Sequence, residues 1–214
     1  MENARPWSER ARRPARTGGD ERERAIMRTA EELLQTCSLG QISVDALARG
    51  AGLSRSAFYF YFPSRDAVVL SLVEQMITDA AAARDEALRA GRAIGPGSWR
   101  ESIAIFFEIF GAHRAVVEAA IELSASNEEA RELWSQTMAG WVQHVTERID
   151  AERARGAAPN GVPARDLATA LVQMNERALG AVFTSTAPAI AESVVLDTLT
   201  HIWVSAIYAP AEPA

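Results

Sequence analysis

The stretch ISVDALARGAGLSRSAFYFYFPSRD, residues 42–66, decides the fold of this chain. Ser43 can cap a short helix, because a serine hydroxyl accepts a hydrogen bond from a free N–H group at a helix start. Gly50 and Gly52 then end that helix, since glycine adopts left-handed backbone angles at little cost. Ser54 can cap a second short helix. Two short helices joined by a tight glycine turn are the helix-turn-helix pattern, whose second helix can enter a DNA major groove.

The second of these helices has two different faces. Its inward face is apolar, because Phe58 and Phe62 stand four residues apart. Arginine can bind guanine through two hydrogen bonds, and hydroxyl groups suit phosphates or base edges. The sequence therefore predicts DNA contacts on the opposite face and at the helix starts: Arg55, Ser56, Tyr59, Tyr61, Ser43 and Ser54. The alternative is a small helical hairpin with a solvated polar face.

The rest of the chain predicts an all-α protein of about nine helices. Helical periodicity covers the remainder in long segments, with a break at Gly111 and loops near residues 91–97, 156–163 and 188. Three pairs read as capping boxes: Asp20 with Glu23, Ser98 with Glu101, and Ser126 with Glu129. The expected helices span about 20–36, 64–90, 98–110, 112–124, 126–155, 164–184 and 191–208, besides the two short ones.

Charge is distributed unevenly along the chain. The net charge is −6, and every basic residue is arginine. Residues 1–66 hold 11 arginines against 9 acidic residues, a net +2, and residues 67–214 hold 11 against 19, a net −8. We expect a disordered arginine-rich arm over 1–19, a DNA-binding domain over 20–66 and a larger helical domain over 67–214. The arm could contact phosphates or the minor groove, or it could be a solubilising tail.

Other features bound the class of protein. No apolar run is long enough to span a membrane, and the N-terminus lacks the apolar core of a signal peptide, so the sequence predicts a cytoplasmic protein. The single cysteine, Cys37, allows no internal disulfide and is expected to pack as a small hydrophobe. The three histidines have no metal-ligand spacing, and no nucleophile, phosphate or dinucleotide motif is present. We therefore expect no metal, no cofactor and no enzymatic activity.

Aromatic side chains gather in the second half of the chain. Trp134, Met138 and Trp141 form one helical stripe, Trp99, Phe106 and Phe110 form another with Ile103, and Trp203 lies on the last helix. Each stripe alone could be ordinary core. The tryptophans favour the interpretation that these stripes line a cavity, because large flat side chains rarely fill a core without leaving gaps. Asn175, on an apolar helix face, could bond a backbone group or orient a ligand.

The segments IMRTAEELL and ISVDALARGAGLSRSAFYFYFPSRDAVV resemble the DNA-binding domain of TetR-type transcriptional repressors. The segments FFEIFGAHRAVV, LWSQTMAGW and VLDTLTHIWVSAIY resemble a mycobacterial repressor of that family, and the similarity extends from Asp20 to Tyr208. The resemblance implies that Arg65 touches the DNA backbone. It also implies a hydrophobic ligand tunnel lined by the aromatic positions above, by His144 and by Asn175. Val172 and His144 stand where that repressor has an asparagine and a tyrosine, which implies a different ligand preference.

The last two predicted helices carry apolar residues on more than one face. They could pair with a second subunit as a four-helix interface or belong to a thick monomer core. Together the patterns predict a homodimeric repressor that binds a near-palindromic operator in double-stranded DNA and is released by a small apolar effector. The alternatives are a TetR-type activator, a non-specific architectural DNA binder, or a helical ligand-binding or enzymatic protein without an operator.

Overall fold

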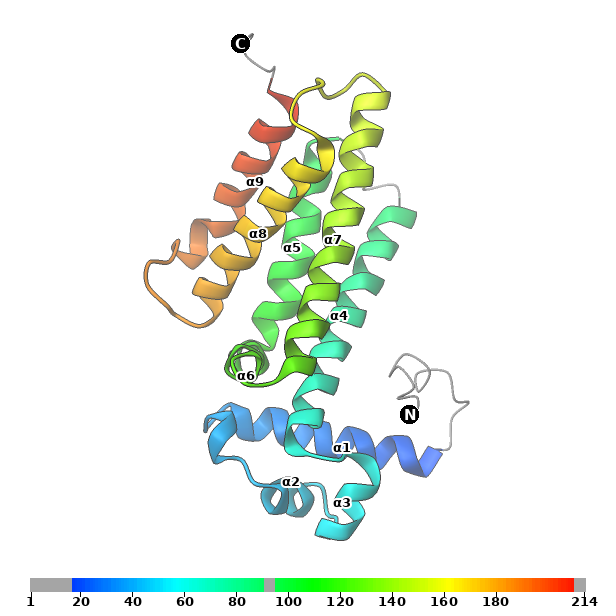
Figure 1. The fold of residues 1–214 in the computed structure, drawn as a ribbon, viewed down its shortest axis with the longest axis vertical. Coiled ribbons are helices and arrows are strands. Elements are labelled where there is room, and N and C mark those ends of the chain that lie inside the picture. The colour runs from blue at the N-terminus through cyan, green and yellow to red at the C-terminus, as the bar shows by residue number, and fades with distance from the viewer. Residues whose placement is uncertain (1–16, 91–94, 210–214) are drawn as a thin grey trace. The chain divides into compact units, whose positions relative to one another are not determined.

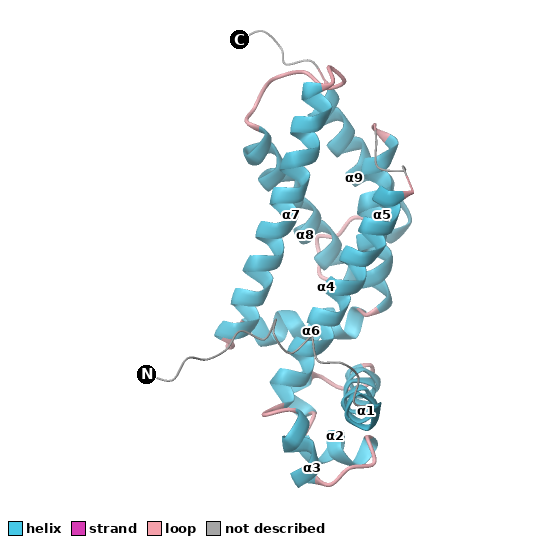
Figure 2. Ribbon diagram, turned by 90° about the vertical axis from the view of Figure 1, so that its right-hand side faces the viewer, coloured by secondary structure: helices cyan, strands magenta, loops and turns pink. Residues whose placement is uncertain are grey.

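The computed structural model describes residues 17–90 and 95–209, and these residues fold into helices without a strand (Figures 1 and 2). The all-α prediction is therefore confirmed. The elements are α1 (Thr17–Leu34), the 3-10 turn η2 (Leu39–Gln41), α2 (Val44–Gly50), α3 (Arg55–Tyr61), α4 (Arg65–Arg89), α5 (Gly97–Ala112), α6 (Arg114–Ser124), α7 (Glu128–Ala154), α8 (Ala164–Phe183) and α9 (Glu192–Tyr208).

The chain divides into two compact units, and the boundary between Val68 and Val69 falls inside α4. In the smaller unit α2 packs against both α1 and α3. Its core includes the fully buried side chains of Ile26, Leu47 and Phe58. This unit contains the helix-turn-helix that the glycine turn predicts.

The start of each short helix is capped as the sequence predicts. Ser43 Oγ accepts a hydrogen bond from the Ala46 N–H at 3.1 Å, and Ser54 Oγ accepts one from the Ala57 N–H at 3.1 Å. Between the helices Gly52 has a φ of 68°, a left-handed conformation that side-chain-bearing residues rarely adopt. Capping and turn chemistry thus fix α2 and α3 locally.

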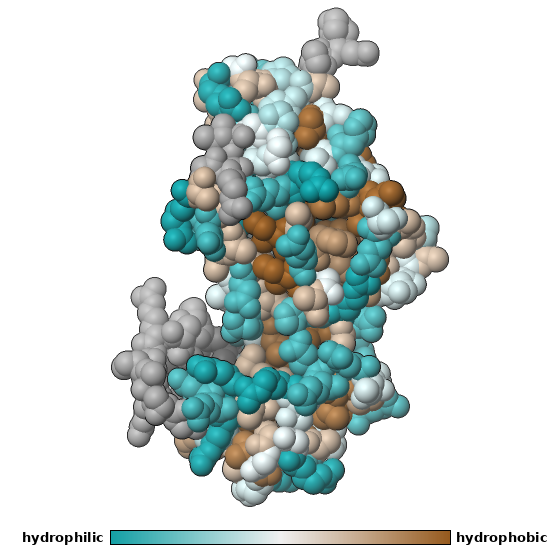
Figure 3. Space-filling model, turned by 180° about the vertical axis from the view of Figure 1, so that it is seen from behind, coloured by the Kyte–Doolittle hydropathy of each residue, from teal (hydrophilic) through white to brown (hydrophobic). Residues whose placement is uncertain are grey.

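In the larger unit α5, α7, α8 and α9 run side by side, and α6 lies across one end of them (Figures 1 and 2). The pairs α7–α8 and α5–α9 approach each other most extensively, whereas the second part of α4 packs more loosely against its neighbours. Trp99, Ile149, Leu199 and Ile207 are among the fully buried side chains of this bundle. On the face drawn in Figure 3, hydrophobic side chains are interrupted by hydrophilic ones.

Several predicted helix starts are wrong. Asp20 lies within the first turn of α1 and does not cap it, because the helix begins at Thr17. Ser98 lies inside α5, and its hydroxyl donates to the Gly95 carbonyl at 2.7 Å instead of capping. Asn127 rather than Ser126 caps α7. The arm expected over residues 1–19 lies outside the described residues up to 16, and residues 17–19 form the first turn of α1.

The structure also bears on the expectations for Cys37 and for a membrane span. Cys37 is half-buried just after α1, and its thiol donates to the Leu33 carbonyl at 3.1 Å. Within the described ranges, no helix is both long and apolar enough to cross a membrane.

Helices α1 and α2 approach each other closely at Gly50. A methyl group added at Gly50 would lie 2.2 Å from the Cγ2 atom of the buried Thr29. We expect Gly50→Ala to lower the free energy of unfolding by about 1–3 kcal/mol, the usual cost of overpacking a close contact. Urea denaturation of the purified variant measures this cost.

Two variants serve as controls for this prediction. Gly140→Ala on α7 places its methyl group where no atom lies within 4 Å, and it should stabilise by about 0.5–1 kcal/mol. Adding Thr29→Ser to Gly50→Ala removes the clashing methyl group and should restore most of the lost stability. Wild-type stability of the single Gly50→Ala variant would contradict the predicted contact.

Candidate functional site

The outward face of α3 carries an exposed group of polar and aromatic side chains. Arg55 and Ser56 are exposed in the first turn, and Tyr59 is 46% exposed one turn later. Phe58 is fully buried and Phe62 nearly so, which anchors the opposite face of the helix. The structure therefore brings three of the predicted contact residues together on one face. Tyr61 is half-buried and therefore less exposed than these three, at the edge of that face.

Arg55 is held in place by exchangeable contacts. Its guanidinium forms an ion pair with Asp45 at 2.7 Å and donates to the Tyr59 hydroxyl at 3.3 Å. Both partners of the ion pair are about half exposed, at 57% and 47% of their side-chain surface. Exposed pairs of this kind contribute little stability. The guanidinium can consequently leave Asp45 for a phosphate or a base at small cost.

The residues predicted to contact phosphates differ in how many of their hydrogen-bond donors are still free. Ser43 and Ser54 use their oxygens as caps, but a hydroxyl that accepts one bond can still donate another. Arg65 donates to the carbonyls of Leu39 at 2.8 Å and Ile42 at 3.2 Å, and it pairs with Asp66. These bonds tie α4 to the turn before α2. Arg65 is thus placed mainly to hold the smaller unit together.

One residue of this surface was missed. Phe60 is 83% exposed beside Tyr61, with the two rings 5.2 Å apart in an edge-on arrangement. The sequence predicts an inward face from Phe58 and Phe62, and Phe60 was assigned to neither face. The helical period indicates its exposure, because Phe60 is two residues from each of the buried Phe58 and Phe62 and therefore lies on the other side of the helix.

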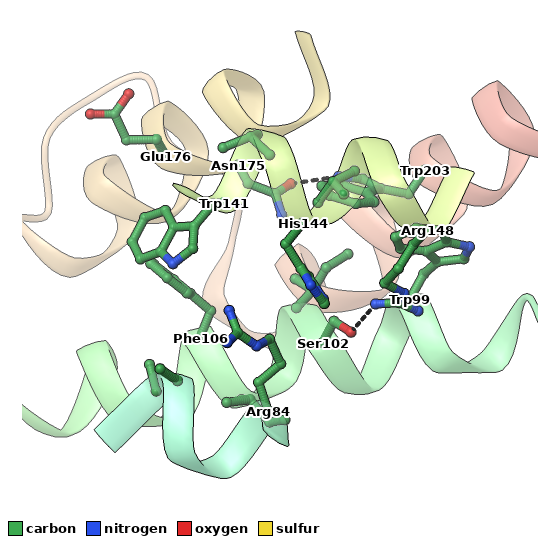
Figure 4. Close-up of a pocket in the computed structure, with 16 residues that line it drawn as sticks. Arg84, Trp99, Ser102, Phe106, Trp141, His144, Arg148, Asn175, Glu176 and Trp203 are labelled. Carbon is green, nitrogen blue, oxygen red and sulfur yellow. Dashed lines mark hydrogen bonds between the residues drawn. The ribbon is translucent and has the colours of Figure 1, made fainter. Parts of the chain in front are cut away.

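A cavity of about 100 Å³ lies within the larger unit (Figure 4). Five helices contribute to its wall. They supply Ala80, Ala81 and Arg84 from α4, Trp99, Ser102, Ile103, Ile105 and Phe106 from α5, Trp141, His144, Val145 and Arg148 from α7, Val172, Asn175 and Glu176 from α8, and Trp203 from α9.

Seven of the ten predicted ligand residues border this cavity: Trp99, Ile103, Phe106, Trp141, His144, Asn175 and Trp203. The other three, Phe110, Trp134 and Met138, do not border it. Phe110 stacks on Phe106 with the ring centres 4.2 Å apart, and Trp134 meets Trp141 edge-on at 5.7 Å. Phe110 and Trp134 thus form a second layer behind the cavity wall.

Hydrogen bonds fix the indoles and the amide at the wall. Trp203 Nε1 donates to Asn175 Oδ1 at 2.9 Å, which leaves the Asn175 NH₂ group to donate elsewhere. Trp99 Nε1 donates to the Tyr208 hydroxyl at 3.0 Å, and that hydroxyl donates to Glu152 at 2.8 Å. Burial alone would raise the pKa of Glu152, but its bonds from Arg155 and Tyr208 outweigh burial and hold the pKa below its ordinary value.

Two arginines at the wall were not predicted, because the expected wall was built from aromatic and apolar stripes. Arg148 lies over the ring of Trp99, with its guanidinium carbon 3.9 Å from the ring centre, and it donates to Ser102 at 2.7 Å and Ser98 at 2.6 Å. Arg84 pairs with its exposed neighbour Asp85 at 2.8 Å. The spacing of Arg148, seven residues after Trp141, was a signal that it shares the aromatic face.

His144 occupies the wall without a hydrogen-bond partner for its Nε2 atom among the described residues. Burial lowers its pKa, and the positive charges of Arg84 and Arg148 lower the pKa further. The imidazole is therefore neutral near pH 7 and can offer one hydrogen bond to a guest. No group of acidic, histidine or cysteine side chains in the described part of the chain could hold a metal ion.

Comparison with known proteins places both units in one family. Residues 26–72 match the model of the bacterial regulatory proteins of the tetR family, and residues 99–209 match that of the C-terminal domain of the transcriptional regulator EthR. The HTH-type transcriptional regulator EthR of Mycobacterium tuberculosis is 50% identical over 93% of each chain. EthR of Mycolicibacterium smegmatis is 47% identical over 93% of this chain and 92% of its own.

Solved structures share the fold at much lower identity. A TetR-family transcriptional regulator from Syntrophomonas wolfei superposes with a TM-score of 0.73 at 14% identity, covering 91% of this chain and 99% of its own. Thermus thermophilus FadR, a TetR-family repressor in complex with lauroyl-CoA, gives 0.63 at 17% identity, covering 90% and 98%. The chain therefore belongs to the TetR family of bacterial transcriptional regulators and carries the C-terminal domain type of EthR.

Proposed function

We propose that the protein is a dimeric repressor whose two helix-turn-helix units read a near-palindromic operator and release it when a small ligand fills the cavity. The observation that carries this proposal is the exposed contact face of α3, where Arg55, Ser56 and Tyr59 stand on a helix anchored by buried phenylalanines. Arginine, serine and tyrosine are suited to base edges and phosphates. Ser43 and Ser54 add hydroxyl donors at the helix starts, and Phe60 adds an apolar contact of the kind that thymine methyl groups accept.

Helix α4 supports a link between ligand and DNA. It begins at Arg65 in the smaller unit and supplies Ala80, Ala81 and Arg84 to the cavity wall in the larger one. It also packs more loosely than the other long helices of the larger unit. A ligand larger than the cavity of about 100 Å³ would displace this wall first. Such a ligand controls DNA binding only through its different affinity for the two positions of α4.

The dimer would form through α8 and α9. Val194 is 48% exposed and Ile202 is 37% exposed on α9, and burying them against a partner would remove apolar surface from water. Leu171, Val195 and Leu199 face the core of their own unit. The surface left for a partner is consequently narrower than the apolar pattern of the sequence indicates.

Affinity selection of fragmented genomic DNA at physiological salt tests this function. The proposal expects a few enriched near-palindromic sites that overlap promoters. Uniform and salt-sensitive retention of all fragments would instead indicate an architectural DNA binder. No retention would indicate a ligand-binding protein or an enzyme without an operator. Reporter expression from an enriched site then separates a repressor from an activator.

Arg55 offers the sharpest test of the DNA surface. We expect Arg55→Ala to weaken binding to the selected operator by about 1–3 kcal/mol and to relax the preference at one base pair, because a two-bond contact to guanine is lost. Fluorescence anisotropy with the operator and its single-base variants measures both effects. Arg55→Lys is the matched control, since it keeps the charge but loses the forked geometry. An unchanged base preference in both variants would remove Arg55 from the reading surface.

The cavity can be tested by filling it. We expect Val172→Phe to leave operator affinity within about twofold while abolishing release by octyl compounds, because the ring occupies the space the ligand needs. The measurement is operator anisotropy during titration with octan-1-ol, octanamide and octanoate. Thermal denaturation checks that the variant is folded. Wild-type release by any of these compounds from a folded Val172→Phe protein would contradict the assignment of the cavity as the ligand site.

A further inference from the structure

The polar groups around the cavity are unbalanced in favour of hydrogen-bond donors. Arg84 and Arg148 carry positive charges at the wall, and His144 and Asn175 can each donate as well. The Ser102 hydroxyl already donates to the Ser98 carbonyl at 2.9 Å. Glu176 is the carboxylate of the wall, and its Oε1 atom accepts from Trp134 Nε1 at 2.7 Å. Figure 4 shows the Glu176 carboxylate turned away from the other labelled side chains. A neutral apolar guest would bring no acceptor or negative charge to these groups.

The two arginines are weakly neutralised. Arg148 bonds to the neutral hydroxyls of Ser98 and Ser102. The carboxylate that attracts it through space, Glu152, is already hydrogen-bonded to Arg155 and Tyr208. Arg84 pairs with Asp85, but that carboxylate is 54% exposed and screened by water. Positive charge therefore remains at the cavity wall for a guest to neutralise.

His144 is the third donor of this polar region. In the view of Figure 4 its imidazole falls between the side chains of Arg84 and Arg148, and both arginines act on it electrostatically. Its Nε2 atom is buried and has no partner in the described part of the chain. A buried polar atom without a partner costs free energy until a ligand satisfies it. An oxygen atom of a guest placed between the arginines would do so.

We propose that the ligand of the cavity is an amphiphile whose anionic head group, of the carboxylate type, is bound by Arg84 and Arg148 with His144 as a third donor. The apolar tail would lie along the aromatic wall, against Phe106 and Trp141. This inference rests on the proposed ligand-responsive function and names its ligand class. Arginine binds carboxylates through two parallel bonds, which favours this head group over a neutral amide or alcohol.

Calorimetric titration of the full-length protein with octanoate and octanamide tests the proposal, because the two compounds share a tail and differ in head-group charge. Octanoate should bind at least about tenfold more tightly, the effect of a charge-assisted hydrogen bond at a partly buried site. Arg84→Gln should reduce octanoate affinity by about tenfold and leave octanamide affinity nearly unchanged. His144→Leu should reduce octanoate affinity by about tenfold and octanamide affinity by less, because a hydrogen bond to a charged oxygen is stronger than one to a neutral carbonyl. Arg89→Gln removes the same charge from the same helix outside the cavity wall and should have no effect.

The outcomes separate this proposal from the function on which it rests. Equal or tighter binding of octanamide, or an Arg84→Gln effect matched by Arg89→Gln, overturns the anionic head-group site. If a neutral octyl compound still releases the operator in that case, the ligand-responsive repressor stands. Failure of both compounds to bind the protein overturns the amphiphile proposal. Failure of the protein to enrich any operator overturns the proposed function, whatever the calorimetry gives.

Discussion

The indole of Trp99 holds three helices of the larger unit together. It is fully buried on α5, its N–H donates to Tyr208 on α9 at 3.0 Å, and the guanidinium of Arg148 from α7 lies 3.9 Å from its ring centre. The ring of Trp203 approaches it at 5.4 Å. Buried polar contacts of this kind fix side-chain positions, because each donor would be costly to leave unpaired. The wall formed by α5, α7 and α9 is therefore the rigid side of the cavity.

The part of the cavity wall that α4 supplies is built differently. Helix α4 presents the small side chains of Ala80 and Ala81 there, and Arg84 makes its ion pair within its own helix. Because the aromatic wall is rigid and α4 packs loosely, α4 is the part of the wall that would move to accommodate a ligand. Since α4 begins in the unit that carries the helix-turn-helix, the proposed function assigns to a shift of α4 the effect of the ligand on DNA binding.

Local chemistry made much of the fold predictable. The caps at Ser43 and Ser54 and the left-handed Gly52 each depend on a few neighbouring residues, and each was confirmed. The break expected at Gly111 lies slightly later, because α5 continues through Ala112 and His113 caps its end. The caps proposed at Asp20, Ser98 and Ser126 failed where alternative starts lay nearby: Asn127, next to Ser126, competes for the same role. Sequence periodicity therefore predicts the presence of a helix more reliably than it predicts the residue at which the helix begins.

The cavity was only partly predictable, for a related reason. A helical stripe identifies a face about 100° wide, and this face includes both the side chains that line a cavity and those that pack behind them. Trp141 and Trp134 share one stripe, yet only Trp141 reaches the cavity. Arg148 and Arg84 were overlooked because a long charged side chain can bury its stem and carry its charge to an interior wall. Their positions depend on the helices opposite, which the sequence of one helix does not encode.

The most direct test of the account is the reciprocity of ligand and operator binding. Operator affinity is measured with and without a saturating octyl ligand, and the affinity for that ligand is measured with and without saturating operator. Linkage requires both affinities to fall by the same factor if cavity and reading helix are coupled. We predict equal factors of at least about fivefold, the lower end of typical coupling. Ligand binding that is equally tight to the free and the operator-bound protein would contradict it.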